Sequence, residues 1–193
     1  MNEQRRARTK LLLIGAMFLA PLVAAITIFF YVPEWSPQGR VNYGTLVSPA
    51  RALPSLALVD AAGAPAPTTF SGKWSLVQLG GASCGESCQS RLLLTRQVRL
   101  ALAKDRLRVQ RVYLAPDPAS LAAARALLAS GNPDLVLVAE TGRRAAAFFA
   151  PADAEAVYLL DPLGNWLMVY AGTVEPKGLL KDLKKLLRYS QVG

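Results

Sequence analysis

An uncharged, apolar run from Leu11 to Val32 constrains this chain more than any other feature of its sequence. As a helix rising about 1.5 Å per residue, the run spans roughly 33 Å, enough to cross a bilayer hydrocarbon core of about 30 Å. Val23-Ala24-Ala25 resembles the cleavage site of a signal peptide, but the apolar run continues past it and is too long for a signal peptide. We therefore predict an uncleaved, single-pass transmembrane helix over residues 11–32.

The charges that flank this run predict its orientation. Four basic residues precede the run, namely Arg5, Arg6, Arg8 and Lys10. Only Glu3 opposes them, and the first charge after the run is Glu34. The positive-inside rule then makes residues 1–10 a cytoplasmic basic tail in the inner (cytoplasmic) membrane, and places the rest of the chain in the periplasm or another extracytoplasmic space. An exported domain argues against nucleic acid as a partner, despite a net charge of +9.

The remaining sequence predicts a stalk followed by one folded domain. Residues 33–55 are rich in proline, glycine and serine, which indicates a mostly extended lead-in. From residue 56 onward, apolar segments alternate with amphipathic ones. The predicted strands are 56–59, 74–79, 107–114, 135–139, 156–160 and 166–171, and the predicted helices are 84–104, 117–129, 141–149 and one that begins at Pro176. This order predicts an α/β fold over residues 56–190, a thioredoxin-like three-layer sandwich.

The residue types that are missing exclude several kinds of chemistry. The chain has no histidine, which excludes Ser-His and Cys-His catalysis, zinc hydrolase motifs and imidazole metal sites. It has two cysteines, Cys84 and Cys88, which is too few for a structural zinc site. Both lie in the domain predicted to be outside the cytoplasm, where disulfides persist.

Cys84 and Cys88 are the candidate site because they come directly after a predicted central strand and open a predicted helix. Unpaired amide groups and the helix dipole favour a thiolate at that position. Residues i and i+4 of a helix share a face, with α-carbons about 6 Å apart, so the pair can form a disulfide or hold a soft cation such as Cu(I). The alternative is a purely structural disulfide, which would close only a short loop.

These residues resemble the Sco/SenC family of membrane-anchored, thioredoxin-like proteins that act in cytochrome c oxidase assembly. The resemblance rests on the CxxxC motif after a strand, on the segment 72–77 that leads to it, on the late hairpin 158–164 and on the single N-terminal anchor. It implies copper as a possible cofactor, with a histidine as third ligand. In this chain the position of that histidine falls near Asp153, and a carboxylate is a hard ligand that suits Cu(I) poorly.

Three functions are therefore carried forward. The first is a thiol–disulfide oxidoreductase, in which Cys84, expected to be the more exposed cysteine, attacks a client protein and Cys88 resolves the mixed disulfide. The second is a Cu(I)-binding assembly factor that uses the same two cysteines. The third is a degenerate scaffold that only binds a partner in respiratory oxidase assembly.

Overall fold

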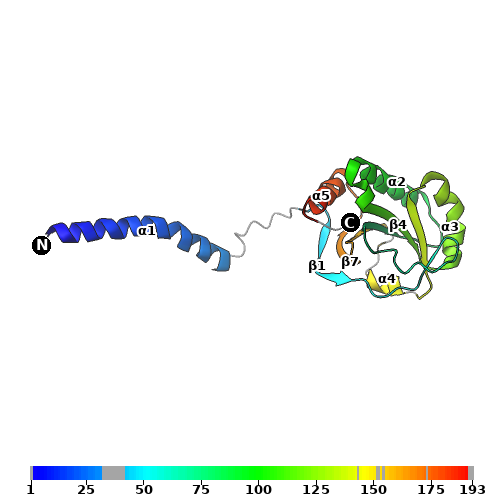
Figure 1. Cartoon of the computed structure of the whole chain (residues 1–193), viewed down its shortest axis with the longest axis horizontal. Helices are drawn as coiled ribbons and strands as arrows, with labels where there is room; N and C mark the ends of the chain where they lie inside the picture. Colours follow the sequence, from blue (N-terminus) through cyan, green and yellow to red (C-terminus); the bar gives the residue numbers. More distant parts are fainter. Residues whose placement is uncertain are drawn as a thin grey trace. The chain divides into compact units, whose positions relative to one another are not determined.

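The computed structural model describes residues 2–31, 42–142, 144–150, 153, 155–172 and 174–190. The chain divides into two units, Met1–Val41 and Asn42–Gly193. The first contains helix α1 and the second contains a single sheet with its covering helices (Figure 1).

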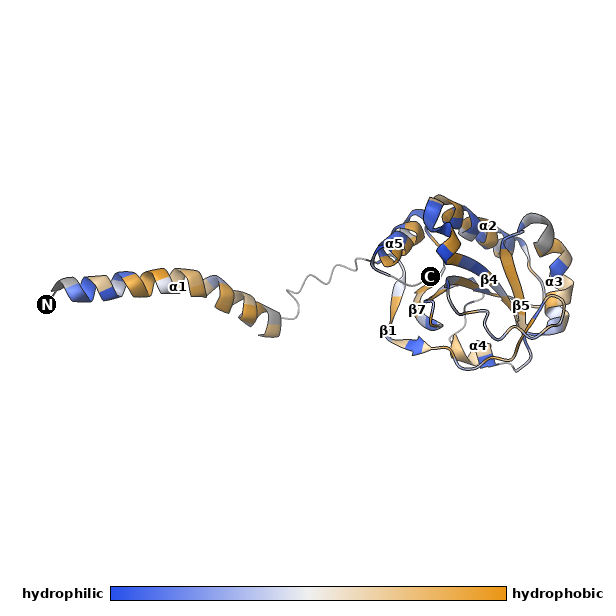
Figure 2. Ribbon diagram, in the orientation of Figure 1, coloured by the Kyte–Doolittle hydropathy of each residue, from blue (hydrophilic) through white to orange (hydrophobic). Residues whose placement is uncertain are grey.

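Helix α1 runs from Asn2 to Tyr31. Its stretch Gln4–Ile28 is long and apolar enough to cross a membrane, with a mean hydropathy of 2.5. Figure 2 shows hydrophilic colours over the first turns and mainly hydrophobic colours beyond them. The predicted apolar N-terminal helix is thus confirmed. It begins earlier than residue 11, since the basic residues continue it, while Val32 lies outside the described residues.

The second unit is built on a seven-stranded sheet with the order β1-β7-β6-β3-β4-β5-β2. The strands are β1 (Thr45–Ala52), β2 (Leu58–Asp60), β3 (Trp74–Leu79), β4 (Val109–Ala115), β5 (Leu135–Glu140), β6 (Val157–Leu160) and β7 (Asn165–Tyr170). Strands β3, β4 and β5 are parallel, and all other neighbours are antiparallel. Strand β3 lies in the middle and is buried almost throughout, as its mainly apolar sequence predicts.

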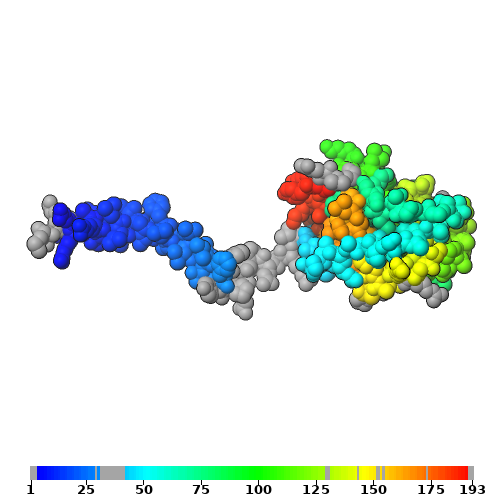
Figure 3. Space-filling model, turned by 60° about the horizontal axis from the view of Figure 1, so that its bottom comes forward, coloured from blue at the N-terminus to red at the C-terminus, as the bar shows by residue number. Residues whose placement is uncertain are grey.

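Helices cover one face of the sheet, and a short helix with a long irregular segment covers the other. The helices are α2 (Glu86–Ala101), α3 (Pro118–Gly131), α4 (Arg144–Phe148) and α5 (Pro176–Tyr189), with a 3₁₀ segment at Ala103–Arg108. Helices α2, α3 and α5 pack on one face through Val98, Leu121 and Leu183. Helix α4 and residues 53–72 pack on the other face, where they run across the surface in Figure 3. This is the predicted thioredoxin-like layered α/β arrangement.

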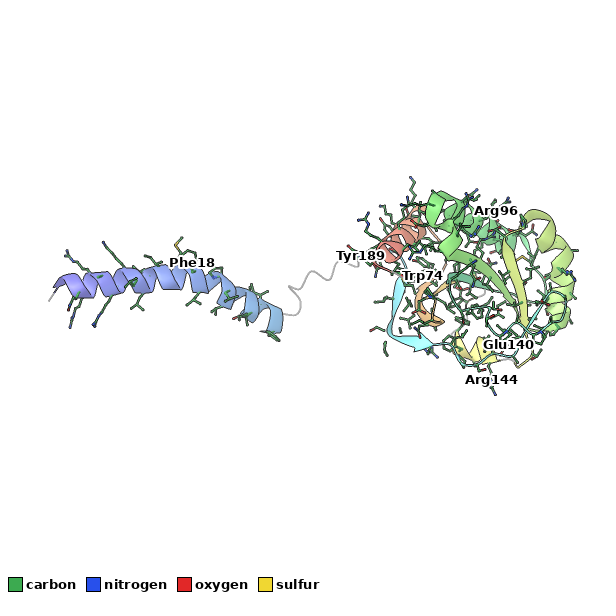
Figure 4. The ribbon with its side chains drawn as sticks, viewed as in Figure 1. Phe18, Trp74, Arg96, Glu140, Arg144 and Tyr189 are labelled. Carbon is green, nitrogen blue, oxygen red and sulfur yellow. A yellow bond between two sulfur atoms is a disulfide. The ribbon has the colours of Figure 1, made fainter. Side chains whose placement is uncertain are left out.

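Helix α4 is held in place by a buried carboxylate. Glu140, at the end of β5, is 2% exposed. Its two oxygens accept hydrogen bonds from the backbone N–H of Arg144 at 2.7 Å and of Ala145 at 2.8 Å. Figure 4 labels Glu140 and Arg144 on this side of the domain. A negative charge at a helix start satisfies unpaired N–H groups there, so Glu140 fixes where this five-residue helix begins.

The folded unit starts earlier than the sequence predicts. Residues 45–52, predicted as part of a stalk, form the edge strand β1, which pairs with β7. The segment is held because the backbone N–H groups of Tyr43 and Gly44 donate to the carboxylate of Asp182 on α5. Residues 33–41 of the predicted stalk lie outside the described residues. The predicted strands and helices from residue 56 onward are present within a few residues of their expected ends.

Candidate functional site

Cys84 and Cys88 form a disulfide where the chain passes from β3 into α2. Their α-carbons are 5.2 Å apart. Cys84 precedes the helix rather than opening it, because Gly85 is extended (φ −74°, ψ −170°) and the helix begins at Glu86. Only Cys88 therefore lies in the first turn of α2. The prediction that both cysteines lie in one helix was therefore wrong, although their sulfur atoms are bonded to each other.

The burial of the two cysteines is the reverse of the prediction. Cys84 is 5% exposed and belongs to a cluster with Leu92, Leu121 and Tyr113. Cys88 is only partly buried and packs against that cluster from outside. The cause is the extended Gly85, after which the chain turns into the helix and leaves Cys84 beneath it. Cys88 is thus the cysteine that a second protein can reach more easily.

Gln78 on β3 contacts Cys88 directly. Its side chain is 2% exposed, and its Nε2 donates to Cys88 O at 3.1 Å and to Cys88 Sγ at 3.3 Å. A hydrogen bond to sulfur stabilises the thiolate more than the thiol, because the acceptor is then charged. The sequence analysis missed this residue. Its signal is the position itself, since a glutamine inside an otherwise apolar central strand needs a hydrogen-bonding partner.

Tyr113 lies beside Gln78 under the same loop. The two residues are paired in register on the parallel strands β3 and β4, and Tyr113 is fully buried. Burial raises the pKa of its hydroxyl, so that the phenol keeps its proton. Its ring and hydroxyl pack against Gly80, where an added Cβ would lie 2.5 Å from Tyr113 Oη. A glycine is therefore required at residue 80 by this close approach.

We expect Gly80→Ala to lower the free energy of unfolding by about 1–3 kcal/mol, because the new methyl group overlaps Tyr113 and forces it to move. Urea unfolding of the oxidised chain measures the change. Gly81→Ala is the matched control in the same loop, since a Cβ added at Gly81 would lie 3.7 Å from Ser83 O, which is an ordinary contact distance. Equal effects of the two substitutions would contradict this account of Gly80.

A polar network links the first turn of α2 to the loop that precedes β6. Ser87, between the two cysteines, donates to Glu155 Oε1 at 2.7 Å. Arg91, one turn later, is 9% exposed, donates to Ser87 Oγ at 3.2 Å and pairs with Glu155 Oε2 at 3.3 Å. Glu155 is therefore the carboxylate that the structure brings to the cysteine-bearing turn. The sequence could not reveal this contact, because it joins residues far apart in the chain.

Asp153, the residue near the expected position of the third copper ligand, stabilises its own loop. Its Oδ1 accepts a hydrogen bond from the backbone N–H of Glu155 at 2.7 Å, and its backbone N–H donates to the Tyr158 hydroxyl at 2.9 Å. Among the described residues, no three cysteine, aspartate or glutamate side chains gather into a group that could hold a metal ion. Asp153 is thus not brought together with Cys84 and Cys88 into a three-ligand site.

With this geometry established, the chain can be compared with known proteins. A family model described as "Transmembrane-like, thioredoxin-like, C-terminal domain" matches residues 74–190. The chain belongs to this family. The matched region begins at β3 and includes both cysteines, the late hairpin and helix α5. A comparison with curated proteins gives no match.

Several solved structures share the fold. Yeast Sco1 matches with a TM-score of 0.62 and 18% identity, over 75% of this chain and 98% of that chain. Yeast Sco1 with copper bound matches with a TM-score of 0.58 and 20% identity, over 72% and 96%. BsSco, described as a member of the Sco family of cytochrome c oxidase assembly proteins with a disulfide switch, matches with a TM-score of 0.55 and 12% identity, over 76% and 99%. At such low identity the likeness is one of fold, and at that level the predicted Sco/SenC resemblance is confirmed.

Proposed function

We propose that this chain is a membrane-anchored, extracytoplasmic assembly factor that acts by thiol–disulfide exchange through Cys84 and Cys88 during cytochrome c oxidase biogenesis. The observation that carries the proposal is the Cys84–Cys88 disulfide at the start of α2, with one cysteine buried and one partly accessible. A purely structural disulfide has no need of an accessible sulfur or of a buried amide that donates to it. The likeness of fold to Sco proteins supports the choice of pathway.

The anchor supports the proposed location. Arg5, Arg6, Arg8 and Lys10 lie at the start of α1 and favour the cytoplasmic side of the inner membrane. The folded unit then lies in the periplasm or an equivalent compartment, where a disulfide can form and where the copper-containing parts of a respiratory oxidase are assembled. A protein client is the substrate in this proposal.

The proposed exchange assigns the two cysteines opposite roles from those that the sequence suggests. In the reduced chain, the Cys88 thiolate is favoured by the first turn of α2 and by Gln78 Nε2. It attacks one sulfur of a client disulfide, and the other client sulfur leaves as a thiolate and takes a proton. Cys84 then loses its proton and attacks Cys88 Sγ, which releases the second client thiolate. Two electrons pass to the client, and a cellular dithiol reductant returns the Cys84–Cys88 disulfide to the dithiol form.

Single serine variants of the full-length chain test this assignment. We expect Cys84→Ser, which lacks the resolving thiol, to accumulate a mixed disulfide with glutathione or with a client protein. Cys88→Ser should form at least tenfold less, because the remaining Cys84 is buried. Mass spectrometry of the thiol-blocked proteins measures both. A Cys88 thiol that does not react with glutathione disulfide near neutral pH contradicts thiol exchange.

A Cu(I)-binding factor is the second proposal, supported by the copper-bound yeast Sco1 that shares the fold. The reduced cysteines could supply two thiolate ligands, which suit Cu(I). Competition with a Cu(I) chelator tests this, using the reduced chain and the Cys84→Ala/Cys88→Ala variant. Equal affinities of the two contradict it. If the same double variant also supports full oxidase assembly in cells, the domain acts as a scaffold and neither sulfur chemistry is required.

A further inference from the structure

Two buried polar atoms, one on β3 and one on β4, have no hydrogen-bond partner among the described residues. No described residue donates a hydrogen bond to Gln78 Oε1 or pairs with the Tyr113 hydroxyl, and both atoms are shielded from solvent. The residues are neighbours in register on β3 and β4, and so they point to the same face of the sheet, toward α2. Gln78 thus contacts Cys88 through its other side-chain atom, and Tyr113 lies in the buried cluster that contains Cys84.

An unpaired polar atom in a dry interior is unfavourable, and almost all such atoms in proteins have a partner. The oxidised state of this site offers poor partners, because a disulfide carries no hydrogen to donate and its sulfur atoms are weak acceptors. Reduction changes this. Each thiol gains an S–H group, which can donate to the amide oxygen of Gln78 or to the phenol oxygen of Tyr113. The reduced dithiol thus supplies the type of partner that each unpaired atom lacks.

We propose that Gln78 and Tyr113 are positioning residues that favour the dithiol over the disulfide by hydrogen bonding to the reduced sulfurs. The inference rests on the proposed thiol exchange and deepens it. In the half-reaction, the Cys84–Cys88 bond breaks, two electrons and two protons are taken up, and two thiols form. Glutathione supplies the electrons and protons in the test below, two molecules of it becoming one glutathione disulfide. The Cys84–Cys88 disulfide is then a stronger oxidant of its partner than a disulfide surrounded only by apolar side chains.

Tyr113→Phe is the sharpest test, because it removes the hydroxyl and keeps the ring. The full-length chain in detergent is equilibrated with mixtures of glutathione and glutathione disulfide, and the dithiol fraction is measured after acid quenching. We expect the equilibrium to shift about tenfold toward the disulfide, which corresponds to about 30 mV for a two-electron couple. Tyr170→Phe is the matched control, since its buried hydroxyl bonds to Asp182 at 3.0 Å and not to the cysteines. It should leave this equilibrium unchanged within twofold.

Unfolding measurements separate a redox role from a packing role. Tyr113→Phe should leave the oxidised protein equally stable or more stable, because an unpaired hydroxyl is removed. It should destabilise the reduced protein. Equal losses in both redox states would mean that Tyr113 only fills space, and would overturn the inference. Tyr170→Phe should cause similar losses in the two states.

Gln78→Leu and Gln78→Met test the second residue. Both remove the amide, so we expect the thiol pKa of Cys88 in the reduced chain to rise, as measured by the ultraviolet absorbance of the thiolate against pH. If the wild-type chain exchanges with glutathione but the Gln78 and Tyr113 variants match it within twofold, this inference fails and the proposed function stands. If the wild-type disulfide does not exchange with glutathione at all, the proposed function fails and this inference with it.

Discussion

Replacing Arg111 with alanine is expected to lower the free energy of unfolding by about 3–5 kcal/mol, because it removes a buried guanidinium that makes four hydrogen bonds. Arg111 lies on β4 and is 1% exposed. Its guanidinium donates to Asp134 Oδ1 at 3.0 Å and to Leu92 O at 2.6 Å. It also donates to Thr95 Oγ1 at 3.1 Å and to Asn132 Oδ1 at 2.9 Å. One side chain thus joins β4 to α2 and to the turn before β5.

The alanine variant loses all four hydrogen bonds. Asp134 keeps Arg99 as a donor at 3.2 Å and Leu92 O keeps Thr95 Oγ1 at 3.1 Å, whereas the donor to Asn132 Oδ1 is removed. Burial lowers the pKa of Arg111, and the nearby Asp134 carboxylate opposes that shift. Urea unfolding of the full-length chain measures the loss. Arg96→Ala on α2 is the control, since Arg96 (labelled in Figure 4) is more exposed and donates to one backbone oxygen, Gly131 O. We expect it to cost less than about 1 kcal/mol. Similar losses for both variants would contradict the importance given to Arg111.

Asp182→Ala is the second large effect that we expect, again about 3–5 kcal/mol, because a buried carboxylate with three donors is removed. Asp182 is 3% exposed, on the inner face of α5. Its Oδ2 accepts from Tyr43 N at 2.9 Å, Gly44 N at 3.0 Å and the Tyr170 hydroxyl at 3.0 Å. Burial and the nearby Asp182 charge both raise the pKa of Tyr170, so the hydroxyl stays protonated as a donor. The alanine variant leaves these three donors without their acceptor at the point where the folded unit begins.

We expect the Asp182→Ala substitution to destabilise β1 locally more than it destabilises the rest of the folded unit. Hydrogen exchange of the β1 amides should quicken by more than tenfold, while the amides of β3 and β4 are affected only through the overall stability. Asp182→Asn keeps one oxygen acceptor and should recover part of the loss. Lys184→Ala removes an exposed side chain from the same helix and should leave β1 exchange unchanged. Unchanged β1 exchange in Asp182→Ala would show that β1 is held by other contacts.

Local sequence pattern predicted most of the sheet and helices. Mainly apolar runs such as Trp74–Leu79 mark the buried central strands. Asp117 followed by Pro118 marks the start of α3, where Ser120 N donates to the Asp117 carboxylate at 2.8 Å. Strand β1 was missed for a physical reason. An edge strand has one neighbour and little buried surface, so Thr45–Ala52 carries no apolar alternation, and Pro49 in its middle suggests a loop.

The site was predicted in its residues but not in its environment. The motif identified Cys84 and Cys88, since their spacing and position after a strand are local properties. Their unequal burial depends on the extended Gly85 and on contacts with α3, and Gln78 and Glu155 reach the site from other elements. Contacts between distant segments leave no periodic trace in a single sequence. Polar residues within apolar strands, such as Gln78 and Arg111, do indicate in the sequence that such contacts exist.

The two edges of the sheet bear on how this chain behaves beside other copies of itself. At one edge, β1 contains Pro49 and the charged Arg51, and its register with β7 shifts between Leu46 and Arg51. At the other edge, β2 is only three residues long. Proline, charge, irregular register and short length each interrupt the row of free backbone groups on which another strand could add. Proteins anchored in a membrane diffuse in two dimensions and meet often, so these two edges would keep neighbouring copies from pairing sheet to sheet.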